Sequence, residues 1–112
     1  MAQLTVTTTD RDGDDIQTLL TAAAAGGDSF ANTGKELFIA SNANASSYTV
    51  TFATQETVDG LAVSDQSITV AQNEEFIVGP FPISIYNDSS GLVQVTYSAV
   101  TDLTVCVVKI GT

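Results

Sequence analysis

Polar and apolar residues alternate along most of the chain, in the period-two pattern of half-buried β-strands. The clearest case is residues 47–53, where Tyr48, Val50 and Phe52 alternate with threonines. Successive side chains of a strand point to opposite faces, so this alternation predicts a strand with one apolar and one polar face. Similar runs predict strands over residues 3–9, 36–41, 61–63, 67–70, 74–78, 83–86, 92–98 and 103–110.

One segment near the N-terminus has a helical pattern instead. Its apolar residues recur at spacings of three and four, at Ile16, Leu19, Leu20 and Ala23, among several alanines. Alanine is the strongest helix former, and such spacing gives one apolar stripe. Asp14 or Asp15 can cap the first turn, and Gly26 can provide a left-handed stop. We therefore expect one short amphipathic helix over residues 15–25, on the sheet or at one end of it.

Glycine and proline divide the strands at short intervals. The segment Gly79-Pro80-Phe81-Pro82 separates the strand expected over residues 74–78 from that over 83–86. Proline lacks the amide donor that a central strand needs, so we expect the chain to cross there from one sheet to another. The closely spaced turns predict an all-β fold, a β-sandwich or jelly-roll of about eight to nine short strands.

A chain of 112 residues is expected to form a single β-sandwich domain over residues 1–112. Residues 1–15 are either an N-terminal arm that reaches a neighbouring molecule or an ordinary edge strand. The first residues lack a basic region followed by an apolar stretch, and no apolar segment has the roughly 20 residues of a membrane span. We therefore expect synthesis in a cytoplasm and no membrane partner.

The charge balance is strongly acidic, with thirteen acidic residues, three basic residues and a net charge of −10. Such a body repels phosphate backbones, so we expect no nucleic-acid partner. Charged residues are nevertheless only 14% of the chain, against a typical value of about 25%. Threonine, serine, asparagine and glutamine must cover the surface. They suit contacts with other proteins, although β-propensity alone also explains the threonines.

The chain offers little catalytic chemistry. It has no histidine, and its single cysteine, Cys106, lies in an apolar run that predicts burial. Glu74 and Glu75 would point to opposite faces of a strand and cannot act as a local pair. We therefore predict a protein that is not an enzyme, with no catalytic residues and no cofactor.

One acidic cluster has the character of a metal-binding loop. Asp10, Asp12 and Asp14 alternate as oxygen ligands do at the start of a calcium loop. The cluster departs from the EF-hand pattern, since Gly13 stands at the fourth position and Thr21 stands where the bidentate glutamate belongs. Two hypotheses remain, a calcium site and a solvated loop that ends in a helix cap.

Three strings resemble small virion proteins that tailed bacteriophages encode among their head genes. They are NTGKELFIASN, VGPFPISIYNDSSGLVQVTYS and VTDLTVCVVKI, spread over about residues 30–110. The resemblance implies a capsid decoration (cement) protein, which binds the outer face of an icosahedral shell between capsomers and holds it against packaged DNA. The implied partners are the major capsid protein and copies of the chain itself, as a dimer or trimer. The implied location is the outer capsid surface.

Five residues are candidate contacts in that role: Leu4, Val6, Phe81, Ile83 and Tyr86. Phe81 lies between two prolines and either contacts a neighbour or packs into its own corner. Each copy would bind weakly, and clustering across capsomers would add avidity. Two alternatives stay open: a head–tail connector or tail protein of the same β type, and a carbohydrate-binding or adhesion module whose aromatic side chains stack on sugars.

Overall fold

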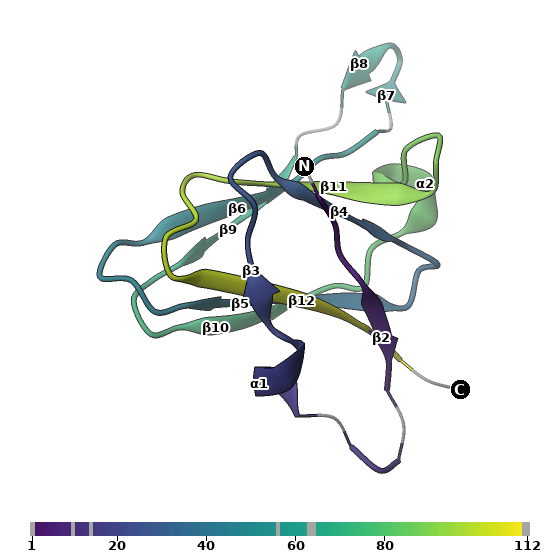
Figure 1. The fold of residues 1–112 in the computed structure, drawn as a ribbon. Helices are drawn as coiled ribbons and strands as arrows, with labels where there is room; N and C mark the ends of the chain where they lie inside the picture. The colour runs from purple at the N-terminus through teal and green to yellow at the C-terminus, as the bar shows by residue number, and fades with distance from the viewer. Residues whose placement is uncertain (1, 10, 14, 56, 63–64, 111–112) are drawn as a thin grey trace.

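The structure, a computed structural model, describes residues 2–9, 11–13, 15–55, 57–62 and 65–110 (Figure 1). Most of its regular structure is β, which confirms the predicted all-β, sandwich-like fold. The strands are β1 (Ala2–Gln3), β2 (Val6–Thr8), β3 (Thr21–Ala22), β4 (Asp28–Ala31), β5 (Glu36–Asn42), β6 (Tyr48–Phe52), β7 (Thr57–Val58), β8 (Leu61–Ala62), β9 (Gln66–Val70), β10 (Glu75–Val78), β11 (Leu92–Tyr97) and β12 (Leu103–Lys109). The described helices are α1 (Ile16–Leu19) and α2 (Ile83–Tyr86).

Two sheets form the body of the molecule. Sheet A has the strand order β1-β4-β11-β6-β9, and sheet B has the order β10-β5-β12-β2, with β3 also paired to β12. Figure 1 shows the two sheets as separate layers, with the small β7–β8 hairpin extending from one end. The chain passes from β10 in sheet B, through the Gly79–Pro82 corner and α2, to β11 in sheet A, so the predicted crossing between sheets is confirmed.

Strand β12 lies in the middle of sheet B. One of its edges pairs antiparallel with β5 along all seven residues. The other edge is shared by two short strands, because β3 pairs with Thr104 and Val105, and β2 pairs in parallel from Val107 to Lys109. Cys106 therefore lies at the junction between β3 and β2.

The first described residues connect the two sheets. β1 pairs in parallel with β4 of sheet A, and β2 pairs in parallel with β12 of sheet B. Between these strands, the Leu4 amide donates to the Ser29 carbonyl at 2.7 Å. In this structure residues 2–8 thus lie along the sandwich as edge strands, one of the two arrangements that the sequence left open.

The core is built from the inward faces of both sheets. On β6, Tyr48, Val50 and Phe52 are buried, while Thr49 points outward, as the alternation predicts. The apolar side chains enclose a cluster of rings with centroids 4.9–6.1 Å apart, made of Phe30, Phe38, Phe52, Phe81 and Tyr86. Aromatic pairs at these separations add to the stabilisation that comes from burial alone.

The helix expected over residues 15–25 is much shorter than predicted. The cap is as expected, since Asp15 Oδ1 accepts the Gln17 amide at 3.0 Å, whereas Asp14 lies outside the described residues. The helix ends at Leu19, and β3 follows as a strand on β12. The Ala23 amide donates to the Leu103 carbonyl at 3.0 Å. Pairing with β12 therefore overrides the helix propensity of the alanines.

Two other elements differ from the sequence prediction. Residues 83–86 form the single helical turn α2 rather than a strand, closed by the Asn87 amide, which donates to the Ile83 carbonyl. Residues 28–31 form β4, although Asp28 and Ser29 are weak strand formers. β4 is held between β1 and β11, so long-range pairing forms it rather than local preference.

Candidate functional site

The charged residues gather where the strands end. Only three acidic residues lie in described strands, and two of these, Asp28 and Glu36, are buried. The other acidic residues of the described chain lie in turns, loops or a helix cap, at Asp12, Asp15, Asp59, Asp65, Glu74, Asp88 and Asp102. The broad outer faces of the two sheets are consequently almost uncharged.

The outer face of sheet A is neutral and polar. Thr96 of β11 pairs with Thr51 of β6, which in turn pairs with Ser67 of β9. The hydroxyl oxygens of Thr51 and Ser67 are 3.1 Å apart and share a hydrogen bond. Threonine and serine thus cover this face.

The outer face of sheet B is apolar. A second cluster of Ile39, Cys106 and Val108 lies there, on the side of the sheet opposite the core, and Leu19, Leu20 and Leu37 pack against it. In Figure 1, α1 lies below sheet B, on the side away from sheet A. The helix covers only part of the cluster, because Ile16 of α1 is 42% exposed and Ile77 of β10 is 65% exposed.

A groove of about 320 Å³ runs between α1 and β10 over this cluster. We call it the α1–β10 groove. Its apolar lining consists of Ile16, Leu19, Leu37, Ile39, Ile77 and Val108. Cross-strand pairing sets Ile77 beside Ile39, and Leu37 beside Val108.

Exposed acidic side chains border the α1–β10 groove. Glu75 lines an adjoining hollow together with Ile16 and Ile77. Asp12 and Asp15 are the sequence neighbours of Gly13 and Ile16, which line the groove itself, and Asp15 also caps α1. Arg11, in the same loop, is the one basic residue beside them in the described sequence. The groove is therefore an apolar floor with a predominantly acidic rim.

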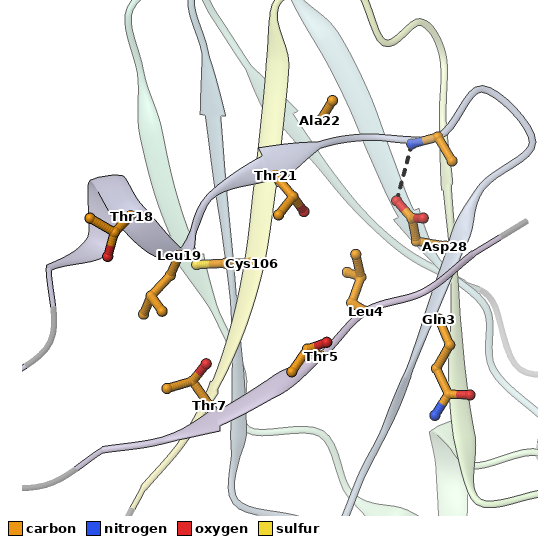
Figure 2. A pocket seen from close by; sticks show the side chains of 11 residues that line it. Gln3, Leu4, Thr5, Thr7, Thr18, Leu19, Thr21, Ala22, Asp28 and Cys106 are labelled. Atoms are coloured by element: carbon orange, nitrogen blue, oxygen red, sulfur yellow. Dashed lines mark hydrogen bonds between the residues drawn. The ribbon is translucent and has the colours of Figure 1, made fainter.

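A second hollow, of about 380 Å³, opens between the N-terminal strands and the α1–β3 segment (Figure 2). We call it the Asp28 pocket. Figure 2 shows Asp28 at one end and Thr18 at the other, with Leu4 and Thr21 between them. Cys106 also lines it, and burial raises the pKa of this thiol, so the thiol stays protonated and is a poor nucleophile near neutral pH.

Two further carboxylates serve the turns that hold them. Glu36 Oε1 accepts the amides of Thr33 and Lys35 at 2.7 and 3.0 Å, which closes the turn before β5. Asp88 accepts amides from Leu92 and Ser90 and the side chain of Gln94. The bond from Leu92, then those from Gln94 and Ser90, hold the pKa of Asp88 below its usual range.

The described residues do not form a calcium site from the candidate ligands Asp10, Asp12 and Asp14. Asp12 is exposed, whereas Asp10 and Asp14 lie outside the described residues. Within the part of the chain that the structure describes, no three acidic or cysteine side chains are placed to share a metal ion. The calcium hypothesis stays a prediction.

The five candidate contact residues have different surroundings. Leu4, Val6 and Tyr86 are half-buried and pack against the main core. Phe81 is only 2% exposed, because it packs between the rings of Phe30 and Phe52 in the corner.

 Of the two expectations for Phe81, packing into its own corner is therefore the one that the structure shows, and Phe81 is corrected as a candidate contact with a neighbour. Ile83, 51% exposed, is the one of the five whose side chain lies mainly in solvent.

The residues of the α1–β10 groove were not among the sequence-based candidates, although the sequence carries a signal for them. In Leu37-Phe38-Ile39-Ala40, apolar residues occupy both alternating positions, and the same holds for residues 105–108. A strand with one solvated face alternates, whereas a continuous apolar run indicates that both faces are covered. The sequence therefore indicates that another surface covers the outer face of sheet B, and α1 covers only a part of that face.

The described part of the chain contains no helix long and apolar enough to cross a membrane. Comparisons with protein-family models, with curated proteins and with solved structures each found no match to the chain.

Proposed function

We propose that the chain is a virion structural protein that binds the outer surface of an icosahedral bacteriophage capsid and stabilises the contacts between capsomers. The observation that carries this proposal is the α1–β10 groove, an apolar floor left open on the outer face of sheet B. The resemblance of three sequence strings to phage head proteins supplies the class of partner. The acidic rim indicates that the partner surface carries basic side chains.

The partner surface that fits the groove has apolar side chains at its centre and lysine or arginine around them. Apolar contact provides affinity, and opposite charges at the rim guide docking and fix its orientation. A second copy of the chain fits this groove poorly, because two rims with Glu75, Asp12 and Asp15 would face each other. Charge complementarity therefore favours a basic capsid surface over self-association through this face.

The affinity of one copy for the shell would be modest. Burial of a fully exposed isoleucine contributes about 1.5–3 kcal/mol, and Ile77 and Ile16, which are 65% and 42% exposed, would each add only part of that, while association itself carries a large entropic cost. A shell offers many equivalent positions, and copies linked to one another bind with avidity. Decoration by many copies is consistent with a small groove on a sheet face that carries few charges.

The direct test is rebinding to emptied heads of the phage that carries the gene. Purified chain is mixed with the heads, the heads are sedimented, and bound copies are counted. We expect saturation at hundreds of copies per head. Saturation near a single ring of copies would instead support the connector alternative, and retention on polysaccharide with no head binding would support the carbohydrate-binding alternative. Either result would overturn the proposal.

A pair of variants locates the contact. Ile77→Glu places a charge in the groove, and we expect it to weaken head binding by at least about tenfold, equal to about 1.4 kcal/mol. Leu61→Glu is the matched control, because Leu61 is 72% exposed on the β7–β8 hairpin, away from the groove. Equal binding by both variants, each folded by circular dichroism, would show that the groove is not the contact.

A further inference from the structure

The Asp28 pocket contains a carboxylate that is buried and has no cationic partner among the described residues. Asp28 is 1% exposed, and its Oδ2 accepts the Tyr97 hydroxyl at 2.7 Å and the Ala24 amide at 3.2 Å. No described residue donates to Oδ1, and no lysine or arginine lines the pocket. Burial of a carboxylate is unfavourable unless its charge is compensated, so this oxygen is a site that lacks a donor.

The free oxygen can be reached from the pocket. Among the described side chains, Gln94 Oε1 is the one buried oxygen or nitrogen that is both enclosed and without a hydrogen-bond partner. Asp28 Oδ1 is therefore not enclosed, although the residue as a whole is buried, and Asp28 is one of the residues that line the pocket. That exposure is small, since the residue as a whole is 1% exposed, so an incoming donor must displace neighbouring side chains of the lining to reach the oxygen.

The rest of the pocket offers a short apolar wall and the polar groups of Gln3, Thr5, Thr7, Thr18 and Thr21. The Thr21 hydroxyl donates to the Val105 carbonyl, and the Thr18 hydroxyl donates to the Asp15 carbonyl. Each hydroxyl hydrogen is thereby used, which leaves the oxygen lone pairs as acceptors. Leu4 and Leu19 line the same space with aliphatic carbon. The lining matches a ligand with several donors on a cationic head and a few methylene groups behind it.

We infer that the Asp28 pocket binds a primary alkylammonium group, with the nitrogen at Asp28 Oδ1 and the aliphatic chain along Leu4 and Leu19. An ammonium carries three donors and pairs with a single carboxylate. A calcium ion needs six to eight oxygens, usually from several carboxylates, and Asp28 is the one carboxylate that the described residues contribute to the lining. The net charge of −10 also concentrates cations near the protein.

The same ammonium chemistry has two sources, a free amine and the lysine side chain of a protein. The pocket binds both groups through one carboxylate, so a free amine tests the site without any capsid. Butylammonium chloride is the probe, with n-butanol as the neutral molecule of equal length and sodium chloride as the control for ionic strength. Binding is followed by the shifts of the amide signals of Ala24, Asp28 and Ala22 in ¹H–¹⁵N spectra of the whole chain.

We expect saturable shifts with butylammonium, and none beyond the salt effect with butanol or sodium chloride. Asp28→Asn keeps an acceptor for Tyr97 and removes the charge, and we expect it to raise the dissociation constant by at least about tenfold. Shifts that do not saturate would overturn the inference, because they would show no defined site. Equal affinity in a folded Asp28→Asn protein would also overturn it, because the carboxylate would then not bind the ammonium.

A second pair of variants decides the matter if Asp28→Asn does not fold. Ala22 is exposed and lines the pocket, so Ala22→Leu occupies the space without altering any charge. Ala31→Leu adds the same bulk at an exposed position of β4 outside the lining. We expect Ala22→Leu to weaken butylammonium binding and Ala31→Leu to leave it unchanged; equal affinities would overturn the inference.

Two lysine probes distinguish a free amine from the lysine side chain of a protein as the natural ligand. Nα-acetyl-lysine methylamide presents the ammonium as a protein would, and the Nε-acetylated form of that probe lacks the charge. Tighter binding of the charged probe than of butylammonium, with added shifts at Gln3 and Thr5 near the N-terminal strand, would assign the site to a lysine of a partner. Tighter binding of butylammonium would assign it to a free amine. Binding of the Nε-acetylated probe as tight as that of the charged one would contradict an ammonium site.

Discussion

Asn32 and Asn87 hold each other by two reciprocal hydrogen bonds. Asn32 Nδ2 donates to Asn87 Oδ1 at 2.7 Å, and Asn87 Nδ2 donates to the Asn32 carbonyl at 2.9 Å. Asn32 Nδ2 also donates to the Phe81 carbonyl, and its Oδ1 accepts the Gly34 amide. This pair therefore joins the end of β4, the Gly79–Pro82 corner and the end of α2 at one point, where Asn32 is buried and Asn87 is half-buried.

Removal of either amide should destabilise the fold. Asn32→Ala leaves the buried Phe81 carbonyl and Asn87 Oδ1 without their donor, whereas Asn87 Nδ2 still donates to the carbonyl of residue 32, and we expect a loss of about 1–3 kcal/mol of unfolding free energy. Asn87→Ala should lose somewhat less, because Asn32 keeps two of its partners. Gln72→Ala removes an exposed amide and should stay within about 0.5 kcal/mol of the wild type. Urea unfolding of the three variants checks this, and three equal midpoints would contradict it.

The same pair shows what the sequence could and could not predict. Period-two alternation identified β6, β11 and the all-β class, because one face of each strand is buried and the other is solvated. Residues 83–86 lie between Phe81 and Asn87, which both bond to Asn32, about fifty positions earlier in the chain, and no local pattern records those contacts. β3 likewise forms only because an edge of β12 lies beside it.

The candidate site was predicted less well than the fold. Contact residues were chosen for hydrophobicity beside turns, and that choice selected Phe81, which the core needs. Exposure of Ile77 depends on how far α1 extends, and the alanines after Leu19 suggested a longer helix than the structure has. Asp28 gave no local signal, because its importance comes from burial between β1 and β11 and from the distant Tyr97.

Phe81 and Ile83 should respond oppositely to truncation. Phe81→Ala leaves a cavity among three rings, and we expect a loss of about 3–5 kcal/mol of unfolding free energy. Ile83→Ala removes a side chain that is 51% exposed and should cost less than about 1 kcal/mol. Thermal and urea unfolding measure both losses. A larger loss for Ile83→Ala would show that the corner is packed differently.

Gly27 should tolerate no side chain. Its φ is +94°, and a Cβ there would lie 2.6 Å from the Val95 carbonyl oxygen of β11. Gly91 has a similar φ of +78° with no atom within 4 Å of such a Cβ. Gly91→Ala should therefore show only the backbone cost of about 1–2 kcal/mol, and Gly27→Ala should lose more. Equal losses in urea unfolding would indicate that β11 shifts freely.

Alkaline pH should weaken the contact between Tyr97 and Asp28. Burial, then the hydrogen bond to Asp28 and the charge of its carboxylate, raise the pKa of Tyr97 above its usual value. The folded state therefore retains a proton that the unfolded chain loses near pH 10, so this stabilisation is complete below about pH 10 and declines as pH rises further.

The Tyr97→Phe variant isolates this contribution. Between about pH 8 and about pH 11, the wild type should lose more unfolding free energy than Tyr97→Phe does. Tyr86→Phe removes a hydroxyl from a ring that contacts Phe81 and should follow the wild type. Urea unfolding at both pH values gives the comparison, and parallel declines in wild type and Tyr97→Phe would refute the link to Tyr97.

Cys106 should react slowly while the protein is folded. The residue is 5% exposed, and burial raises the pKa of its thiol, so little thiolate is present near neutral pH. We expect alkylation by iodoacetamide, followed by mass spectrometry, to be at least about tenfold slower than in the same chain unfolded in guanidinium. Similar rates in the two states would mean that the Asp28 pocket admits the reagent to the sulfur.

The central position of β12 determines when sheet B is completed during synthesis. Its partners β5, β3 and β2 are all made earlier, and Val6 must wait for Val107 before the two can pair. Until residues 103–109 leave the ribosome, the amino-terminal segment has no strand of sheet B to join. Contacts so distant in sequence slow folding, so the finished sandwich is expected to form only after most of the chain has been translated.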